Sequence, residues 1–482
     1  MPDRFRQHRL DVSQAIGSHG AAFVPAFGET IRNDDVSHEF RQDSNFFYLT
    51  GFAEPESVAV LVPGHPDGDY HLFVRPRDRE MEIWNGLRAG VDGARERFQA
   101  DAAYEIGELD ATLPRLLLGR ETIHYQVGNP DHDARISGLV AKARAFRQRT
   151  GKALPRSISD ISPIFSDLRL RKRPEEIDSL RVACELSAEG HREAMRYTRP
   201  GLYEYQVQAA MEYVWREGGS RRNGYPSIVA SGANACILHY VENDRVIEDG
   251  DLVLIDAACE VDYFSSDITR TYPASGRFSP PQRAVYEVVL TAQHTAIAAC
   301  RPGSTMRDIH ETSKRTLTEG LVELGLLPRA VEDSLSMHHY REFFMHGSGH
   351  WLGMDVHDAG SYRVEGKPRP LEAAMAFTVE PGLYIDNREE FEVPLLEYDL
   401  DSWTERTLID GAAAKRELDE LKKEAPKVRH PVPAEFRGIG VRIEDDILIT
   451  ADGHDNLSMR VPRDIEAVES LCAEGSWLRT PR

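Results

Sequence analysis

The sequence predicts two domains, an α/β domain over residues 1–172 and an α+β domain over residues 173–482. The chain has 482 residues, which is more than one ordinary hydrophobic core contains. Its first part alternates short strand-like runs with helix-like stretches, whereas its second part has amphipathic helices and apolar runs that hold acidic residues. A helix start at Pro174, within the segment 169–177, marks the boundary.

The first domain contains runs of β-branched and aromatic residues that are typical of strands. Such runs predict strands at 46–52, 57–63, 70–74 and 122–128. An amphipathic pattern predicts a helix over 133–149. Strands and helices that alternate in this way are typical of a layered α/β arrangement.

The second domain opens with a helix at Pro174. Proline is favoured at the first helical position, and Glu175 and Glu176 interact favourably with the helix dipole. The strand-like runs later in this domain predict an antiparallel-rich sheet with helices packed on it and a functional site on its concave face. The further predicted helices lie at 203–217, about 281–300 and about 305–323.

The segment 387–435 does not fit this pattern. It is charged and contains a predicted helix over 412–424 whose thin apolar stripe holds Leu418 and Leu421. We expect a surface insertion rather than part of the core. It would either decorate the surface or form a rim at the entrance of the site, and we favour decoration.

Composition excludes several classes of function. The net charge of −21, from 79 acidic against 58 basic residues, argues against nucleic acid or an anionic membrane as the main partner. The five cysteines are scattered and never spaced as CxxC, which fits a reducing compartment and argues against a thiolate metal site. The N-terminus lacks the apolar core of a signal peptide, and no run is long enough to span a membrane. We therefore expect a cytoplasmic protein.

Four carboxylates and one histidine in the second domain point to a metal centre. Each carboxylate lies in a short apolar run, where a charge is costly to bury unless it is paired or bound to a cation. A single such residue is as well explained by a satisfied core aspartate, but the whole set is not. Two divalent cations would balance the four negative charges, and oxygen-rich ligation with one imidazole suits Mn²⁺ best, with Co²⁺, Zn²⁺ or Fe²⁺ as alternatives. The five residues are Asp256, Asp267, His350, Glu380 and Glu444.

The local patterns place some of these residues and leave others open. Asp256 and Asp267 lie on two strand-like runs, and a turn between the runs would bring the carboxylates roughly opposite each other. Glu444 is followed by Asp445 and Asp446. Strand alternation does not decide which of these three acids faces the metals.

A centre of this kind is suited to hydrolysis. A metal pair lowers the pKa of a bridging water, so that hydroxide forms near neutral pH, and nearby donors stabilise the oxyanion of a tetrahedral intermediate. Histidines are the natural donors, and three lie close to the ligands in sequence: His239, His346 and His357. The sequence therefore predicts a two-metal hydrolase.

These segments together resemble the pita-bread metallopeptidases, and within them the Xaa-Pro aminopeptidases (aminopeptidase P). The resemblance runs through nearly the whole chain and implies a pita-bread catalytic domain behind a non-catalytic N-terminal domain. In the first domain it rests on RNDDVSHEFRQDSNFFYLTGFAEPES. In the second it rests on ILHYVEN, LVLIDAACEVDYFSSDITRTYP, FFMHGSGHWLGMDVHDAG, FTVEPGLYI and GVRIEDDILIT.

The resemblance implies a role for each matching residue near the metals. The five ligands are those named above, with Asp267 and Glu444 bridging the two ions, so the resemblance selects Glu444 over its two acidic neighbours. His239 and His357 would flank the scissile amide, and His357 would help to hold the oxyanion. Glu380 would also act as a proton shuttle.

The resemblance extends to the substrate side of the site. His346 and Arg442 match residues near the pocket for proline and the residue after it. Asp35 and Trp84 match positions of the N-terminal domain that reach an active site within a homotetramer, although the pattern around Trp84 is only partly matched. The resemblance thus implies a homo-oligomer, a dimer or tetramer. The segment 387–435 has no counterpart in the short bacterial pattern.

The implied activity is release of the first residue from peptides whose second residue is proline, by attack of a metal-bridging hydroxide on the Xaa-Pro amide. The nearest rival is prolidase, which has the same fold and metals but is limited to Xaa-Pro dipeptides. The second glycine of HGSGH leans toward prolidase, whereas FFMH and HWLG lean toward aminopeptidase P. Methionine aminopeptidase is disfavoured by the long N-terminal domain, and creatinase by the complete carboxylate set. A non-catalytic pita-bread binding module is disfavoured because such relatives usually lose metal ligands.

Overall fold

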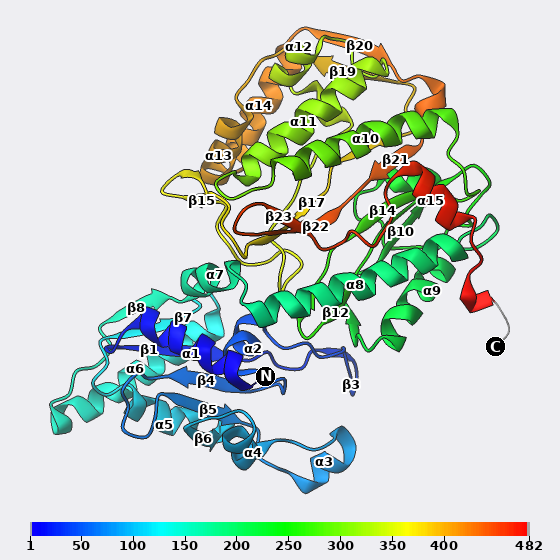
Figure 1. The fold of residues 1–482 in the computed structure, drawn as a ribbon. Helices are drawn as coiled ribbons and strands as arrows, with labels where there is room; N and C mark the ends of the chain where they lie inside the picture. Colours follow the sequence, from blue (N-terminus) through cyan, green and yellow to red (C-terminus); the bar gives the residue numbers. More distant parts are fainter. Residues whose placement is uncertain (1, 480–482) are drawn as a thin grey trace. The chain divides into compact units, whose positions relative to one another are not determined.

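The computed structural model describes residues 2–479, and the chain divides into two compact units, Met1–Arg169 and Leu170–Arg482 (Figure 1). The first unit contains a six-stranded sheet with the order β6-β5-β4-β1-β7-β8. Three strand pairs are parallel and two are antiparallel, so the sheet is mixed. The strands are β1 (Gly20–Pro25), β4 (Val58–Leu61), β5 (Tyr70–Val74), β6 (Ala102–Glu105), β7 (Thr122–Tyr125) and β8 (Ser157–Asp160).

Helices cover this sheet, and the side chains of α5 and α6 share one hydrophobic core with it. The predicted α/β arrangement is confirmed, as are the strands expected at 57–63, 70–74 and 122–128 and the helix expected at 133–149. A separate small hairpin consists of β2 (Ile31–Asn33) and β3 (Val36–Ser37). The helices are α1 (Pro2–Ile16), α2 (Ser44–Thr50), α3 (Arg79–Asn85), α4 (Gly90–Glu96), α5 (Leu109–Leu116), α6 (Pro130–Thr150) and α7 (Ser162–Leu170).

The strand predicted at 46–52 is wrong, because these residues lie in and just after helix α2. The Asp43 side chain accepts a hydrogen bond from the backbone amide of Phe46 and caps the helix start. Gly51 ends the helix in the left-handed conformation, with φ of 66°. Nearly every side chain of α2 is buried, so the apolar run shows neither the helical nor the strand period.

The second unit contains long helices on both sides of a group of strands. Figure 1 shows α8 and α9 on one side of these strands and α10 and α11 on the other. α8 begins with Pro174 at its first position, and the Glu176 carboxylate accepts a hydrogen bond from the Arg173 amide. Within the described residues, none of the helices combines the length and the apolar character of a membrane span. The helices are α8 (Pro174–Tyr197), α9 (Glu204–Glu217), α10 (Pro280–Ala299), α11 (Met306–Glu323), α12 (Val331–Ser336), α13 (Leu400–Asp410), α14 (Ala412–Glu424) and α15 (Ile465–Cys472).

The strands of the second unit pair antiparallel throughout, as predicted. They form several short ladders, with the orders β10-β11-β14, β17-β22-β23, β18-β21 and β13-β12-β9. The main hydrophobic core lies between these ladders and the helices. The strands are β9 (Arg222–Asn223), β10 (Ile228–Ser231), β11 (Leu252–Asp256), β12 (Cys259–Val261), β13 (Phe264–Ser265), β14 (Thr269–Pro273), β17 (Ala376–Val379), β18 (Gly382–Ile385), β21 (Ile439–Arg442), β22 (Asp445–Ile449) and β23 (His454–Asn456). A small hairpin of β15 (Arg363–Val364) and β16 (Lys367–Pro368) lies apart from them.

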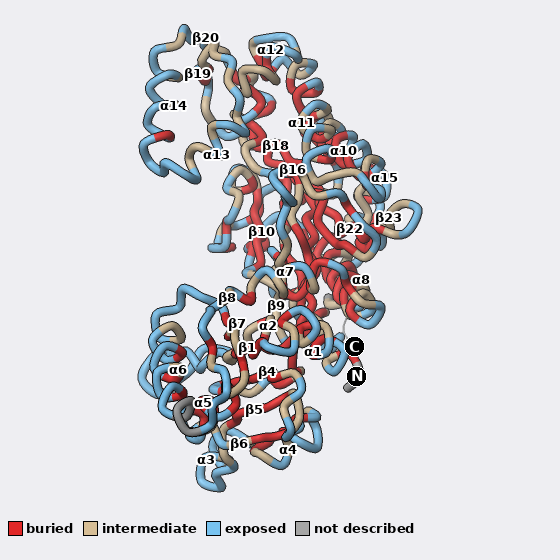
Figure 2. The backbone as a smooth tube through the Cα atoms, turned by 90° about the vertical axis from the view of Figure 1, so that its left-hand side faces the viewer, coloured by how far each residue is buried: buried red, intermediate tan, exposed pale blue. Residues whose placement is uncertain are grey.

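The segment 387–435 is only partly a surface insertion. The predicted helix at 412–424 is α14, and it forms a hairpin with α13 whose side chains are mostly exposed (Figure 2). The prediction is wrong for the two ends of the segment, β19 (Glu390–Pro394) and β20 (Lys427–Pro431), which pair antiparallel. Phe391 and Val393 of β19 belong to the main hydrophobic core. The surface addition is therefore the helical hairpin alone.

Candidate active site

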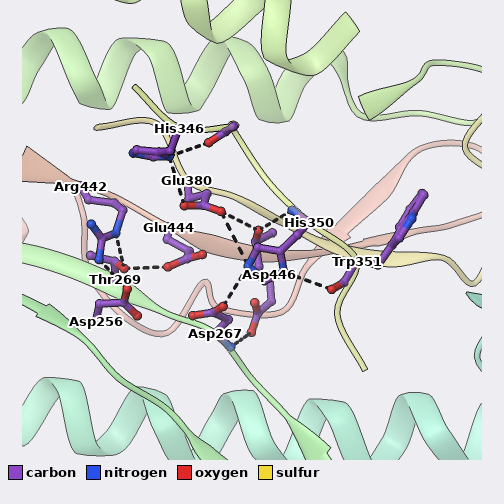
Figure 3. Close-up of polar contacts among 12 residues, drawn as sticks. Asp256, Asp267, Thr269, His346, His350, Trp351, Glu380, Arg442, Glu444 and Asp446 are labelled. Atoms are coloured by element: carbon purple, nitrogen blue, oxygen red, sulfur yellow. Dashed lines mark hydrogen bonds and ion pairs between the residues drawn. The ribbon is translucent and has the colours of Figure 1, made fainter. Parts of the chain in front are cut away.

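One cavity of the second unit collects most of the predicted site residues. It has a volume of about 570 Å³. Figure 3 shows its acidic side chains, His350 and Arg442 directed toward one another from different strands and loops. The predicted residues that line the cavity are His239, Asp256, Asp267, His346, His350, His357, Glu380, Arg442 and Glu444.

Two of the carboxylates come from one interruption in the strand ladders. The pairing of β17 with β22 and the pairing of β18 with β21 leave a gap that holds Glu380 on one segment and Glu444 on the other. Pro381 cannot donate a ladder hydrogen bond because it has no N–H. Both carboxylates are thereby free of regular strand alternation, and both face the cavity.

Asp256 and Asp267 lie at the facing ends of an antiparallel strand pair. Asp256 ends β11 opposite Thr269 of β14, so Asp267 is offset by two residues from the opposite position and lies toward the same face. The Tyr225 hydroxyl joins the two carboxylates, at 2.7 Å from Asp256 Oδ1 and 2.6 Å from Asp267 Oδ1. Tyr225 was not predicted, because a lone tyrosine between a glycine and a proline carries no signal that separates a site residue from a core residue.

Three of the predicted ligands form a tight group. Asp267, His350 and Glu444 each offer one donor atom, and these atoms lie within 4.8 Å of one another. Among the described residues this is the only such group of acidic, histidine or cysteine side chains. His350 Nε2 lies 3.2 Å from Asp267 Oδ2 and 3.7 Å from Glu380 Oε1. Oxygen donors with one imidazole match the preferences of a divalent metal such as Mn²⁺.

The acidic groups perturb one another electrostatically. Burial, together with neighbouring carboxylates, raises the pKa of Glu380 to about 7 and the pKa values of Asp267 and Glu444 above their usual range. Burial alone would lower the pKa of His350, but the carboxylates of Asp267 and Glu380 raise it to about 9. The raised pKa values mean that ionising all of these carboxyl groups together is unfavourable. Bound cations would favour the ionised carboxylates, so the donor set fits one or more cations.

Asp256 is held by a cation of the protein itself. Arg442 Nη2 lies 2.5 Å from Asp256 Oδ2, and both side chains are largely buried. The same guanidinium donates to the hydroxyls of Thr269 and Tyr384. The Thr269 hydroxyl in turn donates to Glu444 Oε2 at 2.6 Å. These contacts orient Asp256 and Glu444 toward the cavity.

The structure separates the three consecutive acids that the sequence pattern left open. Glu444 lines the cavity. Asp445 points away from it and pairs with Arg270 and Arg463, and these two cations help to lower its pKa against the effect of burial. Asp446 accepts a hydrogen bond from the backbone amide of Asp267 at 3.0 Å and lies behind the site.

Arg270 joins the two strand systems that carry predicted ligands. Its side chain is fully buried and its guanidinium bonds five acceptors, which matches its five N–H donors. Two of the acceptors are the backbone carbonyl of Thr269, two residues after Asp267, and the backbone carbonyl of Glu444. Arg270 therefore fixes the backbone near Asp267 and at Glu444 without lining the cavity.

The three predicted histidine donors differ in their surroundings. His346 lies 2.8 Å from the Tyr384 hydroxyl, and burial with the nearby Arg442 lowers its pKa to about 3. The ring of His357 contacts that of His350 at 4.2 Å, and burial lowers the pKa of His357. His239 follows a short 3₁₀ helix, Gly232–Cys236, in a loop at the cavity wall.

Asp35 and Trp84 belong to the first unit. Asp35 lies in the turn between β2 and β3 and is exposed. Trp84 is 79% exposed and is part of α3, next to Ile83 at 75% and close to Leu87 at 81%. The role predicted for Asp35 and Trp84 stays a prediction.

Gly349 allows His350 to approach the other predicted ligands. A Cβ at Gly349 would lie 2.0 Å from the Thr378 carbonyl oxygen, so any side chain there would push the loop from β17. The His350 amide donates to Thr378 Oγ1, and the Thr378 amide donates to the His350 carbonyl. The second glycine of HGSGH therefore has a local packing reason, and it does not by itself favour prolidase.

We expect Gly349→Ala to weaken binding of Mn²⁺ by about 10- to 100-fold, because displacement of His350 removes a well-placed ligand. Gly347→Ala is the matched control, since a Cβ there meets only one atom, at 3.9 Å. Titration calorimetry of both variants measures the effect. Equal Mn²⁺ affinities for the two variants would contradict the packing argument.

Two family models match the chain. The model for the aminopeptidase P N-terminal domain matches residues 5–124, and the model for metallopeptidase family M24 matches residues 178–451. Among named relatives, the Xaa-Pro aminopeptidases of Haemophilus influenzae and Escherichia coli are 38% and 37% identical, each over 97% of both chains.

Solved structures give the same result. The aminopeptidase PepP of Pseudomonas aeruginosa has a TM-score of 0.87 and 43% identity, with 98% of each chain covered. The proline aminopeptidase P II of Yersinia pestis has a TM-score of 0.85 and 38% identity, covering 98% of this chain and 99% of its own. These matches confirm an aminopeptidase P-type N-terminal domain, followed along the chain by a domain with the pita-bread fold. The chain belongs to metallopeptidase family M24, among the Xaa-Pro aminopeptidases.

Proposed function

We propose that this protein is a metal-dependent aminopeptidase that releases the first residue from peptides with proline in second position. The observation that carries the proposal is the single cavity that holds all five predicted ligands and the histidines His239, His346 and His357, in a member of this family. The named relatives are Xaa-Pro aminopeptidases, so the comparisons favour this activity over that of a prolidase. Proline's tertiary amide lacks an N–H and its ring restricts the chain, which makes a dedicated pocket reasonable.

The proposed cofactor is a pair of divalent metal ions, with Mn²⁺ preferred and Co²⁺ or Zn²⁺ as alternatives. Asp256, Asp267, His350, Glu380 and Glu444 would hold the ions. Four carboxylates in one largely buried cavity, with raised pKa values for three of them, support a total charge near that of two divalent cations. When bound, such ions lower the pKa of a coordinated water and polarise the scissile carbonyl.

The remaining cavity residues are proposed to bind and orient the peptide. Glu380, whose pKa is raised to about 7, can hold or release a proton near neutral pH and is proposed as the proton shuttle. His239 and His357 are proposed to flank the scissile amide, and an imidazole N–H of His357 would donate to the developing oxyanion. His346 and Arg442 are proposed to contact the proline and the residue after it.

We also propose that the protein acts as a homo-oligomer, a dimer or tetramer, in which Asp35 and Trp84 approach an active site. Three large apolar side chains of one short segment, Ile83, Trp84 and Leu87, are at least 75% exposed. Such a cluster is unusual on a monomer and typical of an interface. We keep the proposed division into a non-catalytic domain at 1–172 and a catalytic domain at 173–482. The five free cysteines support a cytoplasmic location.

The activity is tested with purified, Mn²⁺-loaded protein on a matched pair of substrates, an Xaa-Pro dipeptide and an Xaa-Pro-Yaa tripeptide. We expect release of the first residue from the tripeptide, measured by chromatography of the products. A tripeptide with alanine in second position is the control and should be a poor substrate. Cleavage confined to the dipeptide would instead identify a prolidase.

The site assignment is tested by Glu380→Gln and Asp267→Asn, which remove a proposed proton carrier and a proposed metal ligand. We expect kcat to fall by about 10²- to 10⁴-fold in each variant, with the circular dichroism spectrum unchanged. Asp452→Asn, at an exposed acid outside the cavity, serves as the control. Near-wild-type turnover of both cavity variants would refute the assignment.

The oligomer is tested by light scattering of the wild type and of a Trp84→Ser, Leu87→Ser double variant. We expect a dimer or tetramer that the double variant weakens, because the two substitutions remove apolar contact area. Leu408→Ser, at an 84% exposed position of α13, is the control and should leave the mass unchanged. A wild type that stays monomeric at micromolar concentrations would exclude the oligomer.

A further inference from the structure

A buried ion pair lies directly beside the cavity histidine His357. Lys172 Nζ is 3.1 Å from Asp358 Oδ2, and both side chains are only 1% exposed. Asp358 follows His357 in the chain, and neither member of the pair lines the cavity. Burial of two opposite charges is costly, and a pair of well-packed apolar residues is often as stable. The Lys172–Asp358 pair is better explained by a role in fixing the conformation of the loop that contains His357.

The Asp358 carboxylate and amide hold the loop that carries His350 and His357. The Asp358 amide donates to the Trp351 carbonyl at 2.9 Å, and the Asp355 amide lies 3.4 Å from Asp358 Oδ1. The chain passes so close that a Cβ at Gly353 would lie 2.1 Å from Asp358 Oδ2. The loop is therefore folded around this carboxylate.

Lys172 is itself fixed to the sheet. Its backbone amide donates to the Ala374 carbonyl at 2.8 Å, and its neighbour Arg171 bridges to Met375, directly before β17. β17 leads to Glu380, so the Lys172 backbone is held by the segment that runs into a strand next to a predicted ligand. The ion pair thus connects that strand to the loop that carries the two histidines.

His357 depends on this connection more than the other cavity residues. Its residue is only partly covered, and its imidazole has no hydrogen-bond partner among the described residues. Its ring contact is with His350. With no hydrogen bond to orient it among the described residues, the ring depends on this one contact and on its backbone, which the buried Asp358 holds.

We propose that Lys172 and Asp358 are positioning residues that place the His357 imidazole for its role in the reaction. The proposal rests on the proposed function, in which His357 donates to the oxyanion, and it extends that role to two residues outside the cavity. A small displacement of such a donor lowers the rate strongly, because the hydrogen bond is productive over only a narrow range of positions.

The first test measures kcat and KM on the Xaa-Pro-Yaa peptide for Lys172→Met, alone and combined with His357→Ala. We expect Lys172→Met to lower kcat by about 10- to 100-fold, with a much smaller change in KM. In the His357→Ala background the same substitution should change kcat less than about twofold, since the donor that it displaces is already absent. An equal fold loss in both backgrounds would show a general structural effect and overturn the proposal.

Two further variants guard against simple misfolding. Lys172→Met, Asp358→Asn should recover part of the activity lost in Lys172→Met, because it removes the buried negative charge that Lys172 balances. Arg171→Met is the matched control: this neighbouring cation is 43% exposed in its pair with Glu372, and its loss should leave kcat within about twofold. A loss in Arg171→Met as large as in Lys172→Met would also overturn the proposal.

The second test does not depend on activity. Hydrogen exchange of the peptide covering 350–360 should become faster in Lys172→Met and stay unchanged in Arg171→Met. Without Lys172 the loop is held less firmly, and the hydrogen bond from the Asp358 amide to the Trp351 carbonyl should open more often. An inactive wild type would refute the proposed function, while faster exchange would still support the anchoring of the loop. Unchanged exchange in Lys172→Met would refute the anchoring whatever the activity.

Discussion

Four carboxylates in one largely buried cavity repel one another, and much of the surrounding structure is arranged to hold them there. Two unit charges a few ångströms apart interact by several kcal/mol at the effective dielectric constant near a protein surface, about 4 kcal/mol at 4 Å. Arg442 offsets part of this repulsion at Asp256, and the Tyr225 hydroxyl bridges Asp256 and Asp267. Behind the cavity, Nη1 of Arg270 donates to the Thr269 and Glu444 carbonyls and so holds the backbone near Asp267 and at Glu444. The protein supplies rigidity and partial charge compensation, and cations would supply the rest.

The ladders explain why so few residues suffice to build the site. A continuous strand would turn alternate side chains away from the cavity. The interruption at Glu380 and Glu444 releases two acids from that alternation, while Asp256, at the end of β11, and Asp267, just before β14, follow it and face the same side. Where regular strand pairing ends, other contacts must hold the backbone in place. Arg270, the close approach at Gly349 and the hydrogen bond from the Asp267 amide to Asp446 are such supports.

Nine of the residues that the sequence predicts for the site line one cavity, whereas some details of the fold were not predicted. Acidic residues inside apolar runs are costly to bury unless paired or bound to a cation, so the pattern singled out Asp256, Asp267 and Glu380 as candidate ligands without a structure. The pattern could not choose among Glu444, Asp445 and Asp446, because all three are buried and only the partners Arg270 and Arg463 show where Asp445 points. Tyr225 and Arg270 act through contacts with residues distant in sequence, which no local pattern records. The error at α2 has a similar origin, since a short helix buried on all sides has no period to read.

The β19–β20 ribbon has a consequence for how this fold tolerates change. Its outer end is closed by the Leu395 amide, which donates to the Pro426 carbonyl at 2.7 Å, so the two ends of the helical hairpin meet there. Strands that already meet are little affected by what joins them, because doubling the length of a loop costs only about 0.6 kcal/mol of closure entropy. The chain between the segments that bear Glu380 and Glu444 can therefore grow or shrink during evolution while the spacing of the two carboxylates stays the same. The β19–β20 pairing makes the distance between the Glu380 and Glu444 carboxylates independent of the number of residues in the hairpin.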